Sequence, residues 1–434
     1  MNTQTNDIFS TPDYKRTRKA YVAECTFEYF VSLLVTDAYL SSLLHHMGIS
    51  DALIGIISSL ISFAFLFQLF ALFAVRKIVS TKRASIIFHF TSQLFFTSLF
   101  FIPFLPFGKE YKTVIVFACV LIAYFGNYLV TSVIYKWGMS FVDNHKRASF
   151  AAGKEMVSLI CGMVFTIIMG VVIDRFAADG NVAGGFIFIG ISILVCSILD
   201  LASLLTMKNL RIEKNKDANE PIFSVLKKLF SNKGFVCMLF ASVLWYVATY
   251  MTNGFMGIYK TSPDNLAFSV GEVQMINNIG CLFRFAVSKP FGKFSDKTSY
   301  ATGILLGTSI AAVCFAVNVF TTPSTRWVIY LYTMLYNGAL AAVHQNFLNI
   351  TFDLVESKYF VQASSIKAAI SGVCGFGASL IGASILNSVQ KNGNSFLGIS
   401  LHGQQLLSAI SAILMIILVL FVLFVLRKQK KIEE

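Results

Sequence analysis

The stretch GQQLLSAISAILMIILVLFVLFVL, residues 403–426, runs for 24 residues without a charged side chain. An α-helix rises about 1.5 Å per residue, so about 20 such residues cross the hydrocarbon core of a bilayer. The chain has eleven further apolar runs, at 20–44, 52–75, 84–107, 112–136, 153–174, 184–207, 234–259, 269–291, 300–320, 326–351 and 366–388. All twelve are too long for the strands of a membrane barrel. The sequence therefore predicts an all-helical integral membrane protein with twelve transmembrane helices.

The composition supports a chain that lies in lipid. Hydrophobic residues make up 56% of the sequence, charged residues only 13%, and Phe alone occurs 43 times. Soluble domains are about a quarter charged, because a globule in water needs a polar surface. The net charge of +13 is carried by short loops between the apolar runs. We read this charge as a topology signal, expect a multi-pass protein of the cell membrane, and exclude nucleic acid as a partner.

The cysteines and histidines predict no metal or cofactor site. Each of the eight cysteines falls within an apolar run, and no two are close in sequence, which excludes a CxxC motif and argues against a disulfide framework. They serve as small apolar residues. The adjacent pair His45 and His46 lies in an expected outer turn, where a solvated turn is favoured over a metal site.

The distribution of Lys and Arg predicts the orientation. The N-terminal tail, the C-terminal tail and every second loop together carry 28 of the 35 basic residues, whereas the alternate loops carry six. Because basic residues accumulate in cytoplasmic loops, both termini are expected in the cytoplasm.

The longest connection, residues 208–233, divides the chain into two halves of six helices, 20–207 and 234–426. Tails of 1–19 and 427–434 flank them. Within the connection, Pro221 precedes apolar residues at helical spacing: Ile222, Phe223, Leu226, Leu229 and Phe230. This pattern favours a short helix on the inner membrane surface over a plain linker.

The two halves carry traces of an internal repeat. A shift of 213 residues aligns five identical pairs: Val142 with Val355, Lys154 with Lys367, Ser158 with Ser371, Cys161 with Cys374, and Gly162 with Gly375. The same shift aligns Asp143 with Glu356. Together with the even division into two halves, this supports parallel repeats about an axis along the membrane normal.

This layout resembles the major facilitator superfamily of secondary transporters. The loop Gly292-Lys293-Phe294-Ser295-Asp296-Lys297 is similar to the family's Gly-x-x-x-Asp-Arg/Lys motif. The equivalent loop of the first half, 76–83, lacks the Gly and the Asp. The resemblance implies transport by alternating access around a central cavity.

In the Gly292–Lys297 loop, Asp296 can act as a latch against the start of the fifth helix, near Arg147 and Lys154, since a helix N-terminus favours negative charge. The simpler interpretation is a solvated loop acid.

The resemblance also implies that helices one, four, seven and ten line the cavity. Each of these runs has polar residues at helical spacing, which is typical of a wet helix face. The candidate substrate-binding residues are Glu28, Asn127, Tyr246, Tyr250, Asn253, Arg284, Tyr336, Asn337 and His344. The alternative is that such side chains only join helices to one another. Aromatic faces with a few amides suit a sugar, a nucleoside or a similar polar organic solute.

Ionisable residues within the runs suggest how transport is coupled. Glu28 and Asp37 are candidates for carrying a proton, whereas Glu24 is expected at the inner interface. Arg284 is the one basic residue well inside a run. Its side chain can snorkel to the inner surface, anchor an anionic solute, or pair with Glu28.

Three other classes of function compete with a coupled transporter. An uncoupled facilitator or a drug-type exporter would have the same fold. A membrane sensor usually adds a soluble output domain, and none is evident. An enzyme needs a nucleophile–base pair or a metal cluster, and the sequence shows neither, nor a GxxxxGK[ST] nucleotide loop. We therefore expect a non-enzymatic, monomeric transporter.

Overall fold

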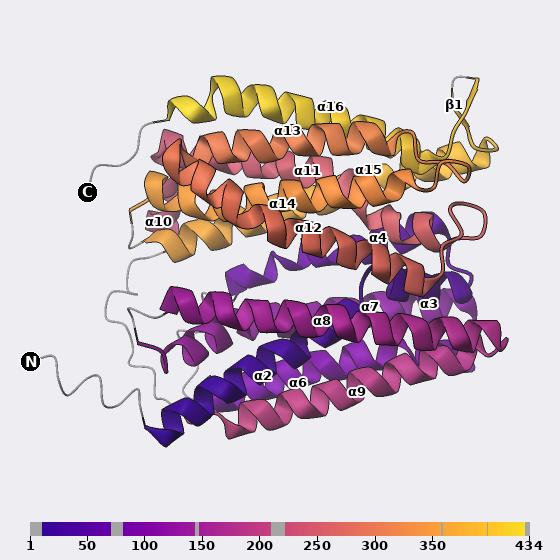
Figure 1. The fold of residues 1–434 in the computed structure, drawn as a ribbon, viewed down its shortest axis with the longest axis horizontal. Coiled ribbons are helices and arrows are strands. Elements are labelled where there is room, and N and C mark those ends of the chain that lie inside the picture. Colours follow the sequence, from indigo (N-terminus) through magenta and orange to yellow (C-terminus); the bar gives the residue numbers. More distant parts are fainter. Residues whose placement is uncertain are drawn as a thin grey trace, which may run out of the picture. The chain divides into compact units, whose positions relative to one another are not determined.

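The computed structural model describes residues 11–70, 81–143, 147–209, 222–356, 359–396 and 398–429. These residues are almost entirely helical (Figure 1). The described strands are β1 (Ser395–Phe396) and β2 (Ile399–Ser400), which pair antiparallel in a short hairpin. The all-helical class predicted from the sequence is confirmed.

The chain divides into two compact units. The first comprises residues 1–48 and 70–216, and the second comprises residues 49–69 and 217–434. The described elements of the first unit are α2 (Pro12–Leu34), α3 (Asp37–His46), α6 (Thr81–Leu99), η1 (Ile102–Phe104), α7 (Lys109–Met139), α8 (Arg147–Ala178) and α9 (Val182–Thr206). Those of the second, besides the hairpin, are α4 (Asp51–Ala64), α10 (Ile222–Ser231), α11 (Lys233–Thr261), α12 (Val270–Lys297), α13 (Tyr300–Asn318), α14 (Val328–Leu354), α15 (Phe360–Lys391), α16 (Gly403–Phe424) and η5 (Leu426–Lys428).

Helix pairing within each unit follows the internal repeat. In the first unit α2 packs on α8 and α9, and α6 packs on α7 and α9. In the second unit α11 packs on α15 and α16, and α13 packs on α14 and α16. Helices α8 and α15 have 32 residues each, and both their first and their last residues are 213 positions apart. The shift seen in the sequence is therefore also the register of two equivalent helices.

The two helices of this pair use equivalent serines for packing. Ser158 of α8 shares a hydrogen bond of 3.1 Å with Thr26 of α2. Ser371 of α15 donates at 2.8 Å to Ser242 of α11. Both contacts join the fifth helix of a half to its first helix, as expected for hydroxyls that link helices in lipid.

Eight helices among the described residues are long and apolar enough to cross a membrane, or nine if α2 and α3 form one bent span. This is fewer than the twelve predicted spans. Helices α6, α12 and α14 fall outside this set because polar residues interrupt their apolar sequence, among them His89, Arg284 and His344.

The first predicted span, 20–44, is not one straight helix. Helix α2 ends at Leu34, α3 begins at Asp37, and the two are bent by 41°. Thr36 is extended and Asp37 has a φ of 46°. Left-handed backbone at a residue other than Gly interrupts helical hydrogen bonding, so the continuous span predicted from hydropathy was wrong here.

The connection between the halves contains the predicted short helix, α10, whose first residue Ile222 follows Pro221. Val225 and Leu229 of α10 are buried, whereas Lys227 and Lys228 are exposed. Leu229 of the predicted stripe and Val225 thus pack against protein, whereas Phe230 of the stripe is exposed. Placement of α10 on a membrane surface stays a prediction.

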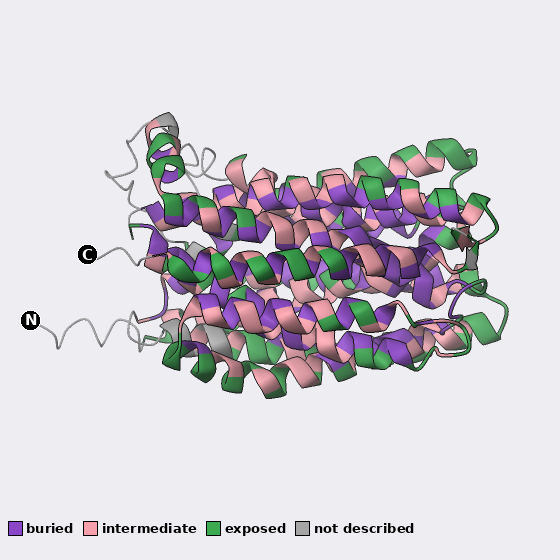
Figure 2. Ribbon diagram, turned by 90° about the horizontal axis from the view of Figure 1, so that it is seen from above, coloured by how far each residue is buried: buried purple, intermediate pink, exposed green. Residues whose placement is uncertain are grey.

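Exposed residues recur along several helices (Figure 2), and many of them are large and apolar. On α8, Ile160, Val164, Ile167 and Val171 are each exposed by 42–55% and recur at helical spacing. Soluble proteins rarely expose apolar faces of this length. These stripes are the surfaces that lipid would cover.

Candidate functional site

The polar residues predicted on α11 gather with two tyrosines of α14. Asn253 donates its amide hydrogen to the hydroxyl of Tyr336, and the hydroxyl of Tyr332 donates to Asn253 Oδ1 at 3.1 Å. The rings of Tyr332 and Tyr336 stack with centroids 6.0 Å apart. One amide therefore bridges two stacked tyrosines.

Tyr246 and Tyr250 extend this group along α11, because residues four apart lie on one face of a helix. Their rings stack with centroids 5.8 Å apart. We call Tyr246, Tyr250, Asn253, Tyr332 and Tyr336 the tyrosine–asparagine cluster.

The cluster residues on α11 are more exposed than the neighbouring residues of the same helix. Tyr246, Tyr250 and Asn253 are half-buried, whereas Trp245 and Thr249 are buried. Tyr246, Tyr250 and Asn253 therefore keep accessible surface along α11, and Tyr336 is half-buried on α14, whereas Tyr332 is buried. A stacked aromatic face beside an amide can hold a planar polar molecule by stacking and hydrogen bonding.

Three further predicted residues belong to the same unit. Arg284 of α12 is half-buried, and His344 of α14 is exposed. Asn337 instead donates to the backbone oxygen of Thr333 in its own helix, at 2.9 Å.

Glu28, Asn127 and Asp37 belong to the first unit. Glu28 is half-buried on α2, and Asn127 of α7 accepts a hydrogen bond from Thr131 through its backbone oxygen at 2.7 Å. Asp37 opens α3 at the bend of the first span. These three residues and the tyrosine–asparagine cluster therefore belong to different units.

The residues of the predicted latch are divided between the units. Asp296 and Lys297 are exposed in the last turn of α12, and Gly292 is half-buried one turn earlier. In the first unit, Lys154 donates to Cys25 Sγ at 3.2 Å and lies over the ring of Tyr21. Arg147 begins α8, but its side chain lies outside the described residues. The latch remains a prediction.

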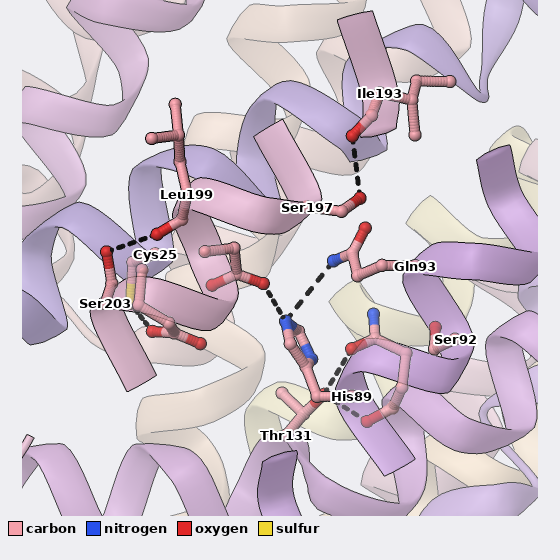
Figure 3. Close-up of polar contacts among 12 residues, drawn as sticks. Cys25, His89, Ser92, Gln93, Thr131, Ile193, Ser197, Leu199 and Ser203 are labelled. Atoms are coloured by element: carbon pink, nitrogen blue, oxygen red, sulfur yellow. Dashed lines mark hydrogen bonds and ion pairs between the residues drawn. The ribbon is translucent and has the colours of Figure 1, made fainter. Parts of the chain in front are cut away.

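A buried polar group in the first unit was not predicted from the sequence (Figure 3). It consists of Glu24 of α2, His89 and Gln93 of α6, and Asp200 of α9, with exposures of 0%, 1%, 2% and 1%. His89 Nε2 lies 2.6 Å from Asp200 Oδ2, and Gln93 Nε2 lies 3.3 Å from His89 Nε2. We call these four residues the buried quartet.

Glu24, which we expected at the inner interface, has its side chain fully buried within the protein. Cys25 donates to Glu24 Oε2 at 3.1 Å. The available signal was His89 with Gln93 four residues later, together with Asp200, each inside an apolar run. Ionisable groups at such positions face protein and are functional candidates by default.

Comparison with protein families identifies the chain. The model of the Major Facilitator Superfamily matches residues 22–383. The chain belongs to this superfamily. Three solved structures with its fold resemble the chain over nearly its whole length.

The nucleoside transporter NupG is 16% identical, with a TM-score of 0.69, over 97% of this chain and 100% of that one. An auto-inhibited peptide transporter of the POT family is 10% identical, with a TM-score of 0.72, over 96% and 98%. A bacterial homologue of the human lysosomal transporter Spinster, inward-facing and unoccupied, is 12% identical, with a TM-score of 0.67, over 96% and 98%.

At these identities the likeness establishes the fold: this is a multi-pass membrane protein with the architecture of superfamily transporters. Among curated proteins, none matches the chain.

Proposed function

We propose that this protein is a secondary transporter that moves a small polar organic solute across the cell membrane by alternating access, with nucleosides as the first class to test. The observation that carries the proposal is the tyrosine–asparagine cluster. Its stacked rings offer two aromatic faces to a planar base, and the Asn253 amide lies beside them. A nucleoside combines a planar ring with hydrogen-bonding edges. The fold of a nucleoside transporter supports the same choice.

A binding screen tests this proposal. We expect nucleosides to raise the melting temperature of the purified protein by several degrees, because a ligand at about 100 times its Kd stabilises the folded state by about 2.7 kcal/mol. Sugars, amino acids and short peptides serve as competing classes, and Asn253→Ala serves as the variant control. The proposal fails if no solute shifts the wild type, or if Asn253→Ala responds equally.

We also propose the full topology of twelve spans with both termini in the cytoplasm. The uneven distribution of Lys and Arg and the family fold support it. In a cysteine-free background, Asn215→Cys and Lys430→Cys, both outside the described residues, should react with an impermeant thiol reagent only after the cells are opened. Labelling of either site from outside intact cells would contradict the orientation.

Coupling to protons is proposed through Glu28 or Asp37, two of the three acidic side chains of the first span. If one of them carries the proton, Glu28→Gln or Asp37→Asn should abolish accumulation against a gradient and leave exchange intact, since a neutral side chain cannot release a proton. Uptake with and without an imposed pH gradient measures this. Asp264→Asn, at an exposed loop position, is the control.

Full gradient-driven uptake in both variants would remove Glu28 and Asp37 as carriers. An uncoupled facilitator is the alternative within the same fold, and it predicts that the wild type itself does not respond to the pH gradient.

A further inference from the structure

Four polar atoms of the buried quartet have no hydrogen-bond partner among the described residues: Glu24 Oε1, His89 Nδ1, Gln93 Oε1 and Asp200 Oδ1. A buried acceptor without a partner costs about 1–3 kcal/mol, and more when it is charged. Three of the four atoms are oxygens that can only accept, unless a carboxyl group is protonated. The quartet therefore has acceptor atoms that a positively charged ligand would satisfy.

The hydrogen bonding around His89 Nε2 is also incomplete. A ring nitrogen offers either one hydrogen or one lone pair. Asp200 Oδ2 at 2.6 Å needs the hydrogen, whereas the Gln93 amide nitrogen at 3.3 Å needs the lone pair. Amide oxygen and nitrogen are assigned from such networks, and turning the Gln93 amide places its unpartnered Oε1 beside His89.

The result is that Asp200 and Gln93 oxygens converge on His89 Nε2, with Glu24 close by. One ligand atom each of Glu24, His89 and Asp200 lie within 4.8 Å of one another. Convergence of an imidazole nitrogen with carboxylate oxygens is the arrangement that a metal ion requires.

A divalent ion would also balance the charge of the quartet. With His89 neutral and both carboxyl groups ionised, the quartet would carry two negative charges, and isolated charges are very costly in a buried apolar region. The other titratable groups nearby are Glu28 and Cys25 of α2, Tyr21 of α2, and Lys154 of α8, whose amine is directed at Cys25. A single divalent ion makes the quartet neutral.

We propose that Glu24, His89, Gln93 and Asp200 bind one divalent first-row transition-metal ion, of the zinc class, that joins α2, α6 and α9 within the first unit. Imidazole with carboxylate oxygen suits such metals, whereas Mg²⁺ and Ca²⁺ prefer oxygen ligands alone. The ion is a structural component of one half and is independent of the transported solute.

Only small movements of the quartet side chains are required to reach the geometry of a metal site. Bonds of about 2.0–2.2 Å to a tetrahedral ion place neighbouring ligand atoms about 3.3 Å apart. The Gln93–His89 distance of 3.3 Å already matches this value. His89 and Asp200, at 2.6 Å, must separate by about 0.7 Å. Glu24 must approach by at most about 1.5 Å from the 4.8 Å limit.

Metal content of the purified full chain tests the proposal. After chelation and reloading with Zn²⁺, mass spectrometry should find one ion per wild-type chain, and less than about a tenth of that in His89→Gln and Asp200→Asn. The double variant His45→Gln, His46→Gln removes the exposed histidine pair instead and should retain one ion. The site is overturned if His89→Gln and Asp200→Asn bind as much Zn²⁺ as the wild type. It is also overturned if the wild type does not bind one ion per chain. Either result means an adventitious ion only.

A second measurement does not depend on the folding of the variants. Co²⁺ added to the chelated wild type should give the visible bands of a tetrahedral nitrogen–oxygen site, which Zn²⁺ removes. Thiolate charge-transfer bands, or no bands, would contradict the assignment. Zn²⁺ at about 100 times its Kd should also lower the unfolding constant about a hundredfold. Neither measurement depends on solute transport. A negative result for the metal site therefore does not contradict the proposed function, and a negative result for transport does not contradict the metal site.

Discussion

Asn253→Ala is expected to lower the kcat/KM of solute uptake about a hundredfold. One amide bridges the hydroxyls of Tyr332 and Tyr336, so its removal leaves both without that partner and removes the proposed ligand of the solute. Two such losses amount to about 3 kcal/mol, and each 1.4 kcal/mol corresponds to a factor of ten. Initial rates of uptake into proteoliposomes measure the effect.

Two variants calibrate this result. Tyr336→Phe removes one hydroxyl and keeps the stacked ring, so about a tenfold loss is expected. Asn349→Ala removes an amide from the same helix as Tyr336, where it accepts only a long hydrogen bond of 3.4 Å from Gln345, and should transport within about twofold of the wild type. Uptake by folded Asn253→Ala within threefold of the wild type would exclude the cluster as the binding site.

Gly254→Ala is expected to destabilise the protein by about 3 kcal/mol. A Cβ at this position would lie 2.1 Å from Ser59 Oγ and 2.7 Å from the backbone oxygen of Gly55, both on α4. The serine hydroxyl can rotate away, but the backbone oxygen cannot, so α4 and α11 must separate. Thermal unfolding of the purified protein measures the loss.

Gly377→Ala on α15 is the matched control, because no atom lies within 4 Å of its added Cβ. It should be neutral or stabilising by up to about 1 kcal/mol, since Ala favours a helix over Gly. Equal melting temperatures for Gly254→Ala and the wild type would contradict the close packing of α4 on α11.

Regular features of the fold were predictable because they are local or periodic in the sequence. The apolar run 403–426 becomes α16, which begins at Gly403, and the apolar stripe after Pro221 becomes α10. The 213-residue shift reappears as the common register of α8 and α15. Hydropathy and spacing carry this information directly.

The structure differs from the sequence-based predictions where backbone geometry or local polarity determines the course of a helix. The bend at Asp37 depends on one left-handed residue, which a hydropathy window averages away. Helix α15 begins at Phe360, six residues before the predicted run, and its Lys367 donates to the backbone oxygen of Phe347.

The polar groups illustrate the same limit. Tyr246, Tyr250 and Asn253 share one face of α11, so the helical period predicts them together. Tyr332 was not predicted, because its bond to Asn253 joins residues 79 positions apart. The buried quartet offered only the spacing of His89 and Gln93 as a signal, since His89 and Asp200 are 111 positions apart. Contacts that form only through tertiary packing leave no spacing in the sequence.

Counterflow of a radiolabelled nucleoside into proteoliposomes preloaded with the same unlabelled nucleoside tests the central claim most directly. The wild type should accumulate label transiently above equilibrium without any imposed ion gradient, and Asn253→Ala should not. The proposed transport would be contradicted if labelled nucleosides and labelled sugars both enter wild-type vesicles no faster than protein-free vesicles.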